Sequence, residues 1–203
     1  MRIGVIQASS QREKNPLLFQ CTKRAAPGHG VINFGVFPGE RENWTYVETA
    51  LLAGMLLSSG AVDFIVTGCS SGQGMMLACN SLPGVLCGYL PTPQDAFLFG
   101  RINGGNAASL PLGLGFGWMG EINLQCTLDK LFDGDFGTGW PPEEAARKRG
   151  DTLLLKELNS ITKGDMSQCI GRYPEELVRK VRGREKVMEY IREFGRGTDI
   201  WAL

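Results

Sequence analysis

Short apolar runs alternate with longer amphipathic segments along the first two thirds of the chain. The apolar runs predict five strands, at residues 2–7, 31–37, 62–67, 84–90 and 106–112. The segments between and after them predict five helices, at residues 15–24, 45–58, 72–81, 94–101 and 121–132. Strands that alternate with helices at this spacing are typical of βαβ units around a parallel sheet. We therefore expect a three-layer α/β/α domain with a mainly parallel, five-stranded sheet.

The composition changes after residue 132. Residues 133–142 are rich in Gly, Pro and aromatic side chains, which is typical of a linker. Two charged segments follow, at residues 143–161 and 174–194, and both have the polarity of surface helices. We therefore predict a domain at residues 1–135 and a helical C-terminal extension at residues 136–203.

Charge and cysteine usage narrow the class of protein. The chain has 21 Lys and Arg against 21 Asp and Glu, so nothing indicates a nucleic-acid partner. No apolar run approaches the roughly 20 residues that cross a bilayer, and the first residues turn polar too soon for a signal peptide. The six cysteines form no Cys-x-x-Cys pair, which favours free thiols over a zinc site. We expect a cytoplasmic protein with neither a nucleic-acid nor a membrane partner.

The third predicted strand leads into a loop of small residues that holds one thiol. The loop reads GCSSGQG at residues 68–74, and a predicted helix follows directly. Main-chain N–H groups and the positive end of a helix stabilise anions, including a thiolate or an enediolate. The loop lacks the Lys-Ser/Thr pair of a P-loop and an acidic partner for ribose, so neither ATP nor NAD is expected. Cys69 is either a reactive thiol or a small buried core residue.

Few other side chains suggest chemistry. His29 is the only histidine, and its position before the second strand predicts a surface turn at the far end of the sheet from the loop. The count excludes a histidine-rich metal site, and with His29 in a surface turn no Ser-His-Asp arrangement is available. Cys79 and Cys87 lie in apolar segments and are expected in the core. Asn103 is either a helix C-cap before Gly104 or, at the carboxyl edge of the sheet, a substrate ligand.

The loop and the helix after it resemble those of a known family. The segments CSSGQG (residues 69–74) and ACN (residues 78–80) are similar to Cys-Gly-Thr-Gly-x-Gly and Ala-Ala-Asn of the ribose-5-phosphate isomerase B and galactose-6-phosphate isomerase family. The likeness continues at GVL (residues 84–86), at Asn103 and at Asn106, and it covers residues 1–132. Members of this family are Rossmann-like aldose–ketose isomerases that need no cofactor.

The resemblance implies a role for each residue of the loop. The family's cysteine moves a proton between C1 and C2 of an open-chain sugar through an enediolate, so Cys69 is the expected base. Ser71 keeps a hydroxyl where the family has Thr and is the second catalytic candidate. Some relatives use a Glu six residues later, where this chain has Met75, which leaves the cysteine form. The expected substrate ligands are the remaining loop residues and one asparagine: Ser70, Gly72, Gln73, Gly74 and Asn103.

The resemblance also implies an assembly, because the family's sites lie between subunits. We therefore expect a homodimer or a homotetramer, without metal or organic cofactor. The helix predicted at residues 45–58 supports this expectation because it is too apolar to face solvent. Trp44 and Tyr46 beside it are either an interface pair or a pocket wall. The extension would then pack over the partner or over the cleft.

Three departures from the family pattern concern the substrate. The family's Asp-His pair in the first loop is replaced here by Ala8-Ser9, and its ring-opening His by Ile102. Its phosphate-binding arginines have only a loose counterpart at residues 147–149, where Arg149 is the candidate. Ser9 and Arg149 are thus the expected ligands of an altered substrate, which is already open, lacks phosphate or carries a carboxylate. The alternative is a non-catalytic sugar-phosphate-binding or regulatory protein on the same fold.

Overall fold

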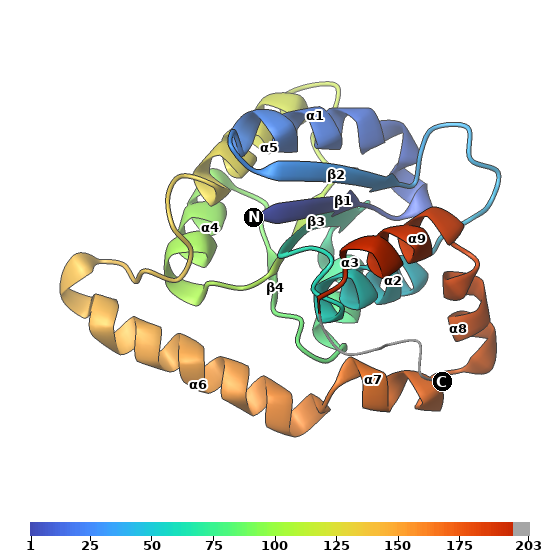
Figure 1. Cartoon of the computed structure of the whole chain (residues 1–203). Helices are drawn as coiled ribbons and strands as arrows, with labels where there is room; N and C mark the ends of the chain where they lie inside the picture. The colour runs from blue at the N-terminus through green and yellow to red at the C-terminus, as the bar shows by residue number, and fades with distance from the viewer. Residues whose placement is uncertain (197–203) are drawn as a thin grey trace.

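The structure, a computed structural model, describes residues 1–196. At its centre is a sheet ordered β2-β1-β3-β5-β4 in which all neighbouring strands are parallel, so β3 is the central strand. Helices cover both faces of the sheet (Figure 1). The predicted three-layer α/β/α fold is confirmed. The strands are β1 Arg2–Ile6, β2 Gly30–Gly35, β3 Phe64–Cys69, β4 Cys87–Tyr89 and β5 Ala107–Pro111.

Alternate residues of the strands divide the core into two apolar layers. Ile3 and Phe64 face the layer that α1, α4 and α5 cover, whereas Ile6 and Ile65 face the layer that α2 and α3 cover. A parallel sheet that is buried on both faces requires apolar residues at both sets of positions. These helices are α1 Asn15–Ala25, α2 Tyr46–Ser58, α3 Gln73–Asn80, α4 Pro93–Leu98 and α5 Gly120–Leu131.

The predicted helical extension is present. Figure 1 shows α6 running beneath the sheet domain, after which the chain turns back so that α9 lies against α2. The segment before α6 is tied to the domain, because the N–H groups of Gly137 and Gly139 donate to the carbonyls of Gly100 and Arg101 at 2.8 and 2.7 Å. The division at residue 135 stays a prediction. The elements are η3 Pro142–Glu144, α6 Ala145–Lys163, α7 Met166–Cys169, η4 Ile170–Arg172, α8 Glu175–Arg182 and α9 Glu185–Phe194.

Helix α2 is buried by its own chain. Its core residues share one apolar cluster with side chains of α7, η4, α8 and α9, namely Met166, Ile170, Val181, Val187, Met188 and Ile191. Burial within the chain therefore accounts for the apolar character of this helix, which gives no support to a subunit interface. The oligomeric state itself stays a prediction. Within residues 1–196, no helix combines the length and apolar character that a membrane crossing demands.

One predicted helix of the extension is in fact two. Residues 174–194 form α8 and α9, which are separated at Gly183 and Arg184. The backbone of Arg184 leaves the helical region, with φ −76° and ψ 71°. Its side chain donates hydrogen bonds to the carboxylate of Glu40 and to the carbonyl of Phe34. The helix pattern could not reveal this break, because the hydrogen-bond partners of Arg184 lie about 150 positions away in the sequence.

We predict that Leu56→Ala lowers the free energy of unfolding by about 2–5 kcal/mol, because it leaves a cavity in the buried α2 layer. Leu56 is 0% exposed, whereas Leu98 at the end of α4 is 43% exposed. The same truncation at Leu98 is therefore expected to cost less than about 1 kcal/mol. Urea denaturation of the two variants measures the difference. Equal losses would contradict the burial of α2.

Candidate active site

Three loops meet at the carboxyl edge of the sheet. The N–H of Ala8 donates to the carbonyl of Gly68 at 3.1 Å, which joins the loop after β1 to the end of β3. Ser9 and Trp44 exchange two hydrogen bonds, from Ser9 N–H to the Trp44 carbonyl at 2.9 Å and from Trp44 N–H to Ser9 Oγ at 2.7 Å. The loop after β2 is thereby joined to the loop after β1. Open α/β sheets bind ligands at this edge.

Cys69 is the last residue of β3 and lies at this edge. The residue is 9% exposed and belongs to the apolar cluster on the α2 and α3 side of the sheet, and the exposed Ser70 follows it directly. The Cys69 carbonyl accepts the N–H of Leu112 at 3.0 Å, which holds the strand end against the chain after β5. Helix α3 begins at Gln73, and the first N–H groups of a helix lack intrahelical acceptors and form its positive end. Cys69 is therefore a nearly buried residue that directly precedes the small-residue loop and the start of α3.

Gly72 allows the loop to contact β5. Its φ is +77°, and a Cβ atom at this position would lie 2.8 Å from the ring of Tyr89 and 2.9 Å from the carbonyl carbon of Leu110. The hydroxyl of Ser109 donates to the Gly72 carbonyl at 2.6 Å. Only glycine fits both the backbone conformation and the space. This contact fixes the path of the chain between Cys69 and α3.

The remaining loop candidates lie at the surface. Ser70 and Gln73 are exposed, and Ser71 and Gly74 are half-buried. The hydroxyl of Ser71 accepts the N–H of Gln73 at 3.4 Å. The hydroxyl of Ser70 accepts a hydrogen bond from Gln11 Nε2 at 2.9 Å. These side chains are therefore accessible to a ligand that approaches the carboxyl edge.

Trp44 and Tyr46 have different positions: one is buried and the other is exposed. Trp44 is 1% exposed and is bonded to Ser9, so it is an internal wall of the chain. Tyr46 is 46% exposed and lies beside the start of α3, with a ring carbon 3.5 Å from the position of a Cβ on Gly74. Ser9 itself is buried, and its hydroxyl oxygen already accepts the bond from Trp44.

Sequence reasoning missed two residues of this edge, Gln11 and Arg12, which lie in the turn η1 (Ser9–Lys14). Gln11 links this turn to Ser70, as described above. Arg12 donates from Nε to the Ser9 carbonyl at 3.1 Å and from Nη1 to the Glu40 carbonyl. Their position directly after the first strand was the one feature of the sequence that indicated the carboxyl edge. No sequence pattern pairs residue 11 with residue 70.

Asn103 does not lie where the sequence predicted. It is exposed and ends η2 (Phe99–Asn103), just before β5. The first residue of β5, Ala107, pairs with Ile65 near the start of β3, whereas Cys69 pairs with Pro111. Asn103 is therefore at the amino edge of the sheet, and the prediction of the carboxyl edge was wrong. The reason is that the chain after β4 returns through α4 and η2 to the opposite edge before β5 begins.

Arg149 on α6 lies on the same side as Asn103. It is exposed, and its Nη1 donates to the Thr138 carbonyl at 2.8 Å. One turn further along α6, the hydroxyl of Thr152 donates to the carbonyl of Ile102 at 2.8 Å. Within one chain, the predicted ligands thus form two groups. Ser9 and residues 69–74 lie at the carboxyl edge, and Asn103 and Arg149 lie at the amino edge.

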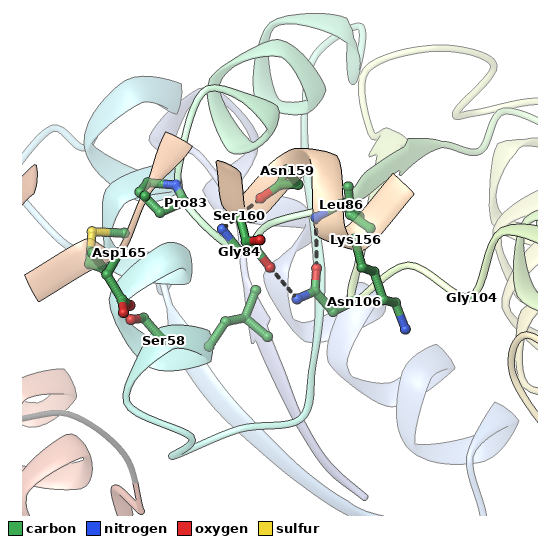
Figure 2. Close-up of a pocket in the computed structure, with 13 residues that line it drawn as sticks. Ser58, Pro83, Gly84, Leu86, Gly104, Asn106, Lys156, Asn159, Ser160 and Asp165 are labelled. Atoms are coloured by element: carbon green, nitrogen blue, oxygen red, sulfur yellow. Dashed lines mark hydrogen bonds between the residues drawn. The ribbon is translucent and has the colours of Figure 1, made fainter. Parts of the chain in front are cut away.

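A cavity of about 510 Å³ lies at the amino edge, between the end of α2, the residues before β4 and β5, and α6 (Figure 2). Asn106 helps to line it, accepting the N–H of Leu86 at 2.8 Å and donating to the Gly84 carbonyl at 2.7 Å. Asn159 accepts the N–H of Gly84 at 3.0 Å. Both amides are thus used to hold the backbone. None of the predicted ligands lines this cavity.

The other cysteines and the histidine considered above lie away from the candidate site. Cys79 and Cys87 are buried, as predicted. A hydrogen bond with Cys79 and burial raise the pKa of the Cys87 thiol, which keeps it protonated. His29 is exposed at the amino edge, where its Nδ1 lies 3.2 Å from the terminal amine of Met1. Among the residues that the structure describes, no three His, Cys, Asp or Glu side chains gather to hold a metal.

Comparison with known proteins identifies the family. The family model described as ribose/galactose isomerase matches residues 3–132. The chain belongs to the ribose/galactose isomerase family. The match covers the whole sheet and ends just after α5. A search of curated proteins gave no match.

Two solved structures are similar to this family member over nearly its full length, the extension included. A 4-deoxy-L-threo-5-hexosulose-uronate ketol-isomerase complexed with a tartrate is 38% identical, with a TM-score of 0.93, and the match covers 98% of this chain and 95% of that one. A ribose-5-phosphate isomerase from Vibrio parahaemolyticus is 37% identical, with a TM-score of 0.92 and coverage of 98% and 95%. The protein is therefore a sugar isomerase, an enzyme that interconverts aldoses and ketoses.

A more distant structure shares the fold alone. The type B ribose 5-phosphate isomerase from Trypanosoma cruzi is 17% identical, with a TM-score of 0.66. The match covers 79% of this chain and 99% of that one. The shorter protein therefore lacks a counterpart to about a fifth of this chain.

We predict that Gly72→Ala lowers the free energy of unfolding by about 1–3 kcal/mol, because the new Cβ combines a strained φ with a clash against β5. Gly30 is the matched control, since a Cβ there meets nothing within 4 Å. Gly30→Ala is expected to stay within about 1 kcal/mol of the parent protein. Thermal and urea unfolding of both variants test this. An unaffected Gly72→Ala protein would contradict the loop geometry.

Proposed function

We propose that this sugar isomerase uses Cys69 as its base and an enediolate as its intermediate. The observation that carries the proposal is the position of Cys69 at the end of the central strand, where the residue is 9% exposed. The glycine-bearing loop and the start of α3 follow it directly. This arrangement offers a nucleophilic sulfur and anion-stabilising donors to one small ligand.

The reaction then needs no oxidant and no cofactor. The Cys69 thiolate removes the proton from C2 of an open-chain aldose, and the electron pair moves into the C1–C2 bond while O1 takes the negative charge. The same sulfur returns the proton to C1, and the hydroxyl proton passes from O2 to O1, which gives the ketose. Main-chain donors of residues 70–74 stabilise the enediolate, and Ser71 orients a hydroxyl. One preorganised donor of this kind is typically worth about 3–4 kcal/mol of barrier.

The substrate that fits best is an open-chain sugar acid. Ile102 stands where the family's ring-opening His is expected, so the chain is suited to a substrate that is already open. The buried Ser9 replaces a family ligand for hydroxyl and phosphate groups. The relative that is 38% identical is named for a hexosulose uronate, which carries a carboxylate and no phosphate. The relative that is 37% identical is named for ribose 5-phosphate, which makes this sugar phosphate the second candidate.

We expect the protein to isomerise 4-deoxy-L-threo-5-hexosulose uronate with a kcat/KM well above that for ribose 5-phosphate. In deuterium oxide, the product should gain solvent deuterium at carbon, as NMR would show. Cys69→Ala should reduce turnover and exchange by at least about 100-fold, because it removes the proton acceptor. Cys126→Ala, at an exposed cysteine, is the matched control.

Undiminished exchange in Cys69→Ala would remove this thiol from the mechanism. A preference for ribose 5-phosphate would overturn the choice of substrate. Thermal stabilisation by a sugar phosphate without any turnover of either compound would favour the non-catalytic alternative.

We also propose that the complete site lies between two copies of the chain. Asn103 and Arg149 lie at the opposite edge of the sheet from Cys69, so they reach a Cys69 only across an interface. Helix α6, which carries Arg149, exposes five apolar side chains by 44–70%: Leu153, Leu154, Leu155, Leu158 and Ile161. Tyr46, Val47 and Leu77 are also exposed, by 46%, 43% and 65%, on the helices that follow the carboxyl edge. Two such apolar surfaces are typical of an interface.

Mixing two inactive variants tests the shared site. Cys69→Ala and Asn103→Ala carry lesions at opposite edges, so a mixed dimer holds one intact site. Random reassortment should restore up to about a quarter of the parent activity. Cys69→Ala mixed with Ser71→Ala should restore none, because both lesions lie at the same edge. A monomeric mass in light scattering, or no recovery in the first mixture, would contradict the proposal.

We further propose a cytoplasmic location, which the free cysteines of the chain support.

A further inference from the structure

The segment between β2 and α2, residues 36–45, lies between the candidate active site and the C-terminal extension; we name it the β2–α2 loop. On the side of the site, its Trp44 holds Ser9 through the two hydrogen bonds described above. Arg12 bridges the carbonyls of Ser9 and Glu40. The next residue back from Ser9 is Ala8, which is bonded to Gly68. The β2–α2 loop is thus two hydrogen bonds away from the backbone beside Cys69.

On its other side, the β2–α2 loop is held by Arg184, which lies between α8 and α9. The guanidinium donates from Nη2 to Glu40 Oε1 at 3.0 Å, from Nη1 to Glu40 Oε2, and from Nη2 to the Phe34 carbonyl at 3.0 Å. The Glu40 carboxylate also accepts the N–H of Phe37 at 2.7 Å. Burial raises the pKa of Glu40, but the hydrogen bonds from Arg184 and Phe37 outweigh it, so the pKa lies below its usual value. The carboxylate is therefore charged at neutral pH.

A second cation of the extension holds the end of the same loop. Lys180 on α8 donates to the Asn43 carbonyl at 2.7 Å and to Glu48 Oε1 at 2.9 Å. Glu48 also accepts the N–H of Thr45 in the capping box that starts α2. Lys180 and Arg184 lie 5.3 and 5.1 Å from the ring of Trp44, within the range of a cation–π contact.

The loop has few anchors of its own. Residues 38, 39 and 41–43 are exposed, and only Val36 and Trp44 are buried. An exposed loop with so few apolar contacts opens at little cost unless other groups hold it. This loop meets charged groups of the extension at Glu40, at the Asn43 carbonyl and at Trp44. Arg184 contacts Glu40 and Trp44.

We propose that the C-terminal extension positions the isomerase site, with Arg184 as the main positioning residue and Lys180 as the second. Arg184 fixes Glu40 and Trp44, Trp44 fixes Ser9, and the loop after β1 is thereby fixed against the end of β3. This inference rests on the proposed function where it is tested by turnover at Cys69. It gives two charged residues of the extension, Arg184 and Lys180, a role in positioning the site.

Arg184→Met tests the proposal, since it keeps the length of the side chain and removes the fork of donors. The variant is expected to lose about tenfold or more in kcat/KM, mainly in kcat, because small displacements of a reacting group cost this much. Glu40→Gln should show the same type of loss. The double variant should lose no more than the worse single one, because both remove one interaction. Arg179→Met, an exposed arginine of α8, is the matched control and should keep full activity.

A second readout does not depend on the substrate. Alkylation of Cys69 by iodoacetamide, followed by peptide mass spectrometry, should become severalfold faster in Arg184→Met, because release of the β2–α2 loop makes this residue, which is only 9% exposed, more accessible. If the parent protein lacks isomerase activity, this rate still tests the positioning. A lower melting temperature with unchanged kcat/KM and unchanged alkylation, both measured well below melting, would overturn the proposal. Partial rescue by Arg184→Lys would support it.

Discussion

The contact between the loop after β3 and strand β5 is the constraint on which the geometry of the site depends. Gly68 and Gly72 press against the backbone of Leu110, where a side chain at either position would clash. Ser109 and Leu112 then fix the loop from both sides by bonding to the carbonyls of Gly72 and Cys69. Because the backbone is held there, the side chain of Cys69 and the start of α3 have fixed positions. The chemistry that we propose needs this fixed relation more than it needs any one donor.

The C-terminal extension packs against the domain beside the candidate site of the same chain. Its apolar side chains complete the core layer around α2. Its cations, Lys180 and Arg184, reach the charged and aromatic groups of the β2–α2 loop. The domain itself holds this loop at Val36, Trp44 and the Glu40 carbonyl, and the extension adds bonds to the Glu40 carboxylate and the Asn43 carbonyl. The two similar structures that cover 98% of the chain share this part, whereas the match to the smaller isomerase covers only 79%.

The strand pattern predicted the architecture well and the element ends less well. The strand expected at residues 84–90 is only β4, Cys87–Tyr89. Asn106 binds the backbone of Gly84 and Leu86, and Asn80 binds that of Cys87. Side-chain amides thus bond the backbone just before β4 and at its first residue. The helix expected at residues 94–101 divides into α4 and the π-helical η2, which ends at Asn103 and is capped by Gly104 with a φ of +54°. Such ends depend on partners that the local pattern does not contain.

The sequence by itself determined the order of strands and helices, the thiol-bearing loop after the third strand and the family, because periodicity and a short glycine motif are local properties. Only the tertiary structure decided which candidates share an edge of the sheet. It placed Asn103 and Arg149 away from Cys69, joined Gln11 to Ser70, and showed that α2 is covered by its own chain. Those facts follow from the path of the connections and from charges far apart in the sequence, such as Glu40 and Arg184. The periodicity of apolar residues predicts neither the path of the connections nor the pairing of distant charges.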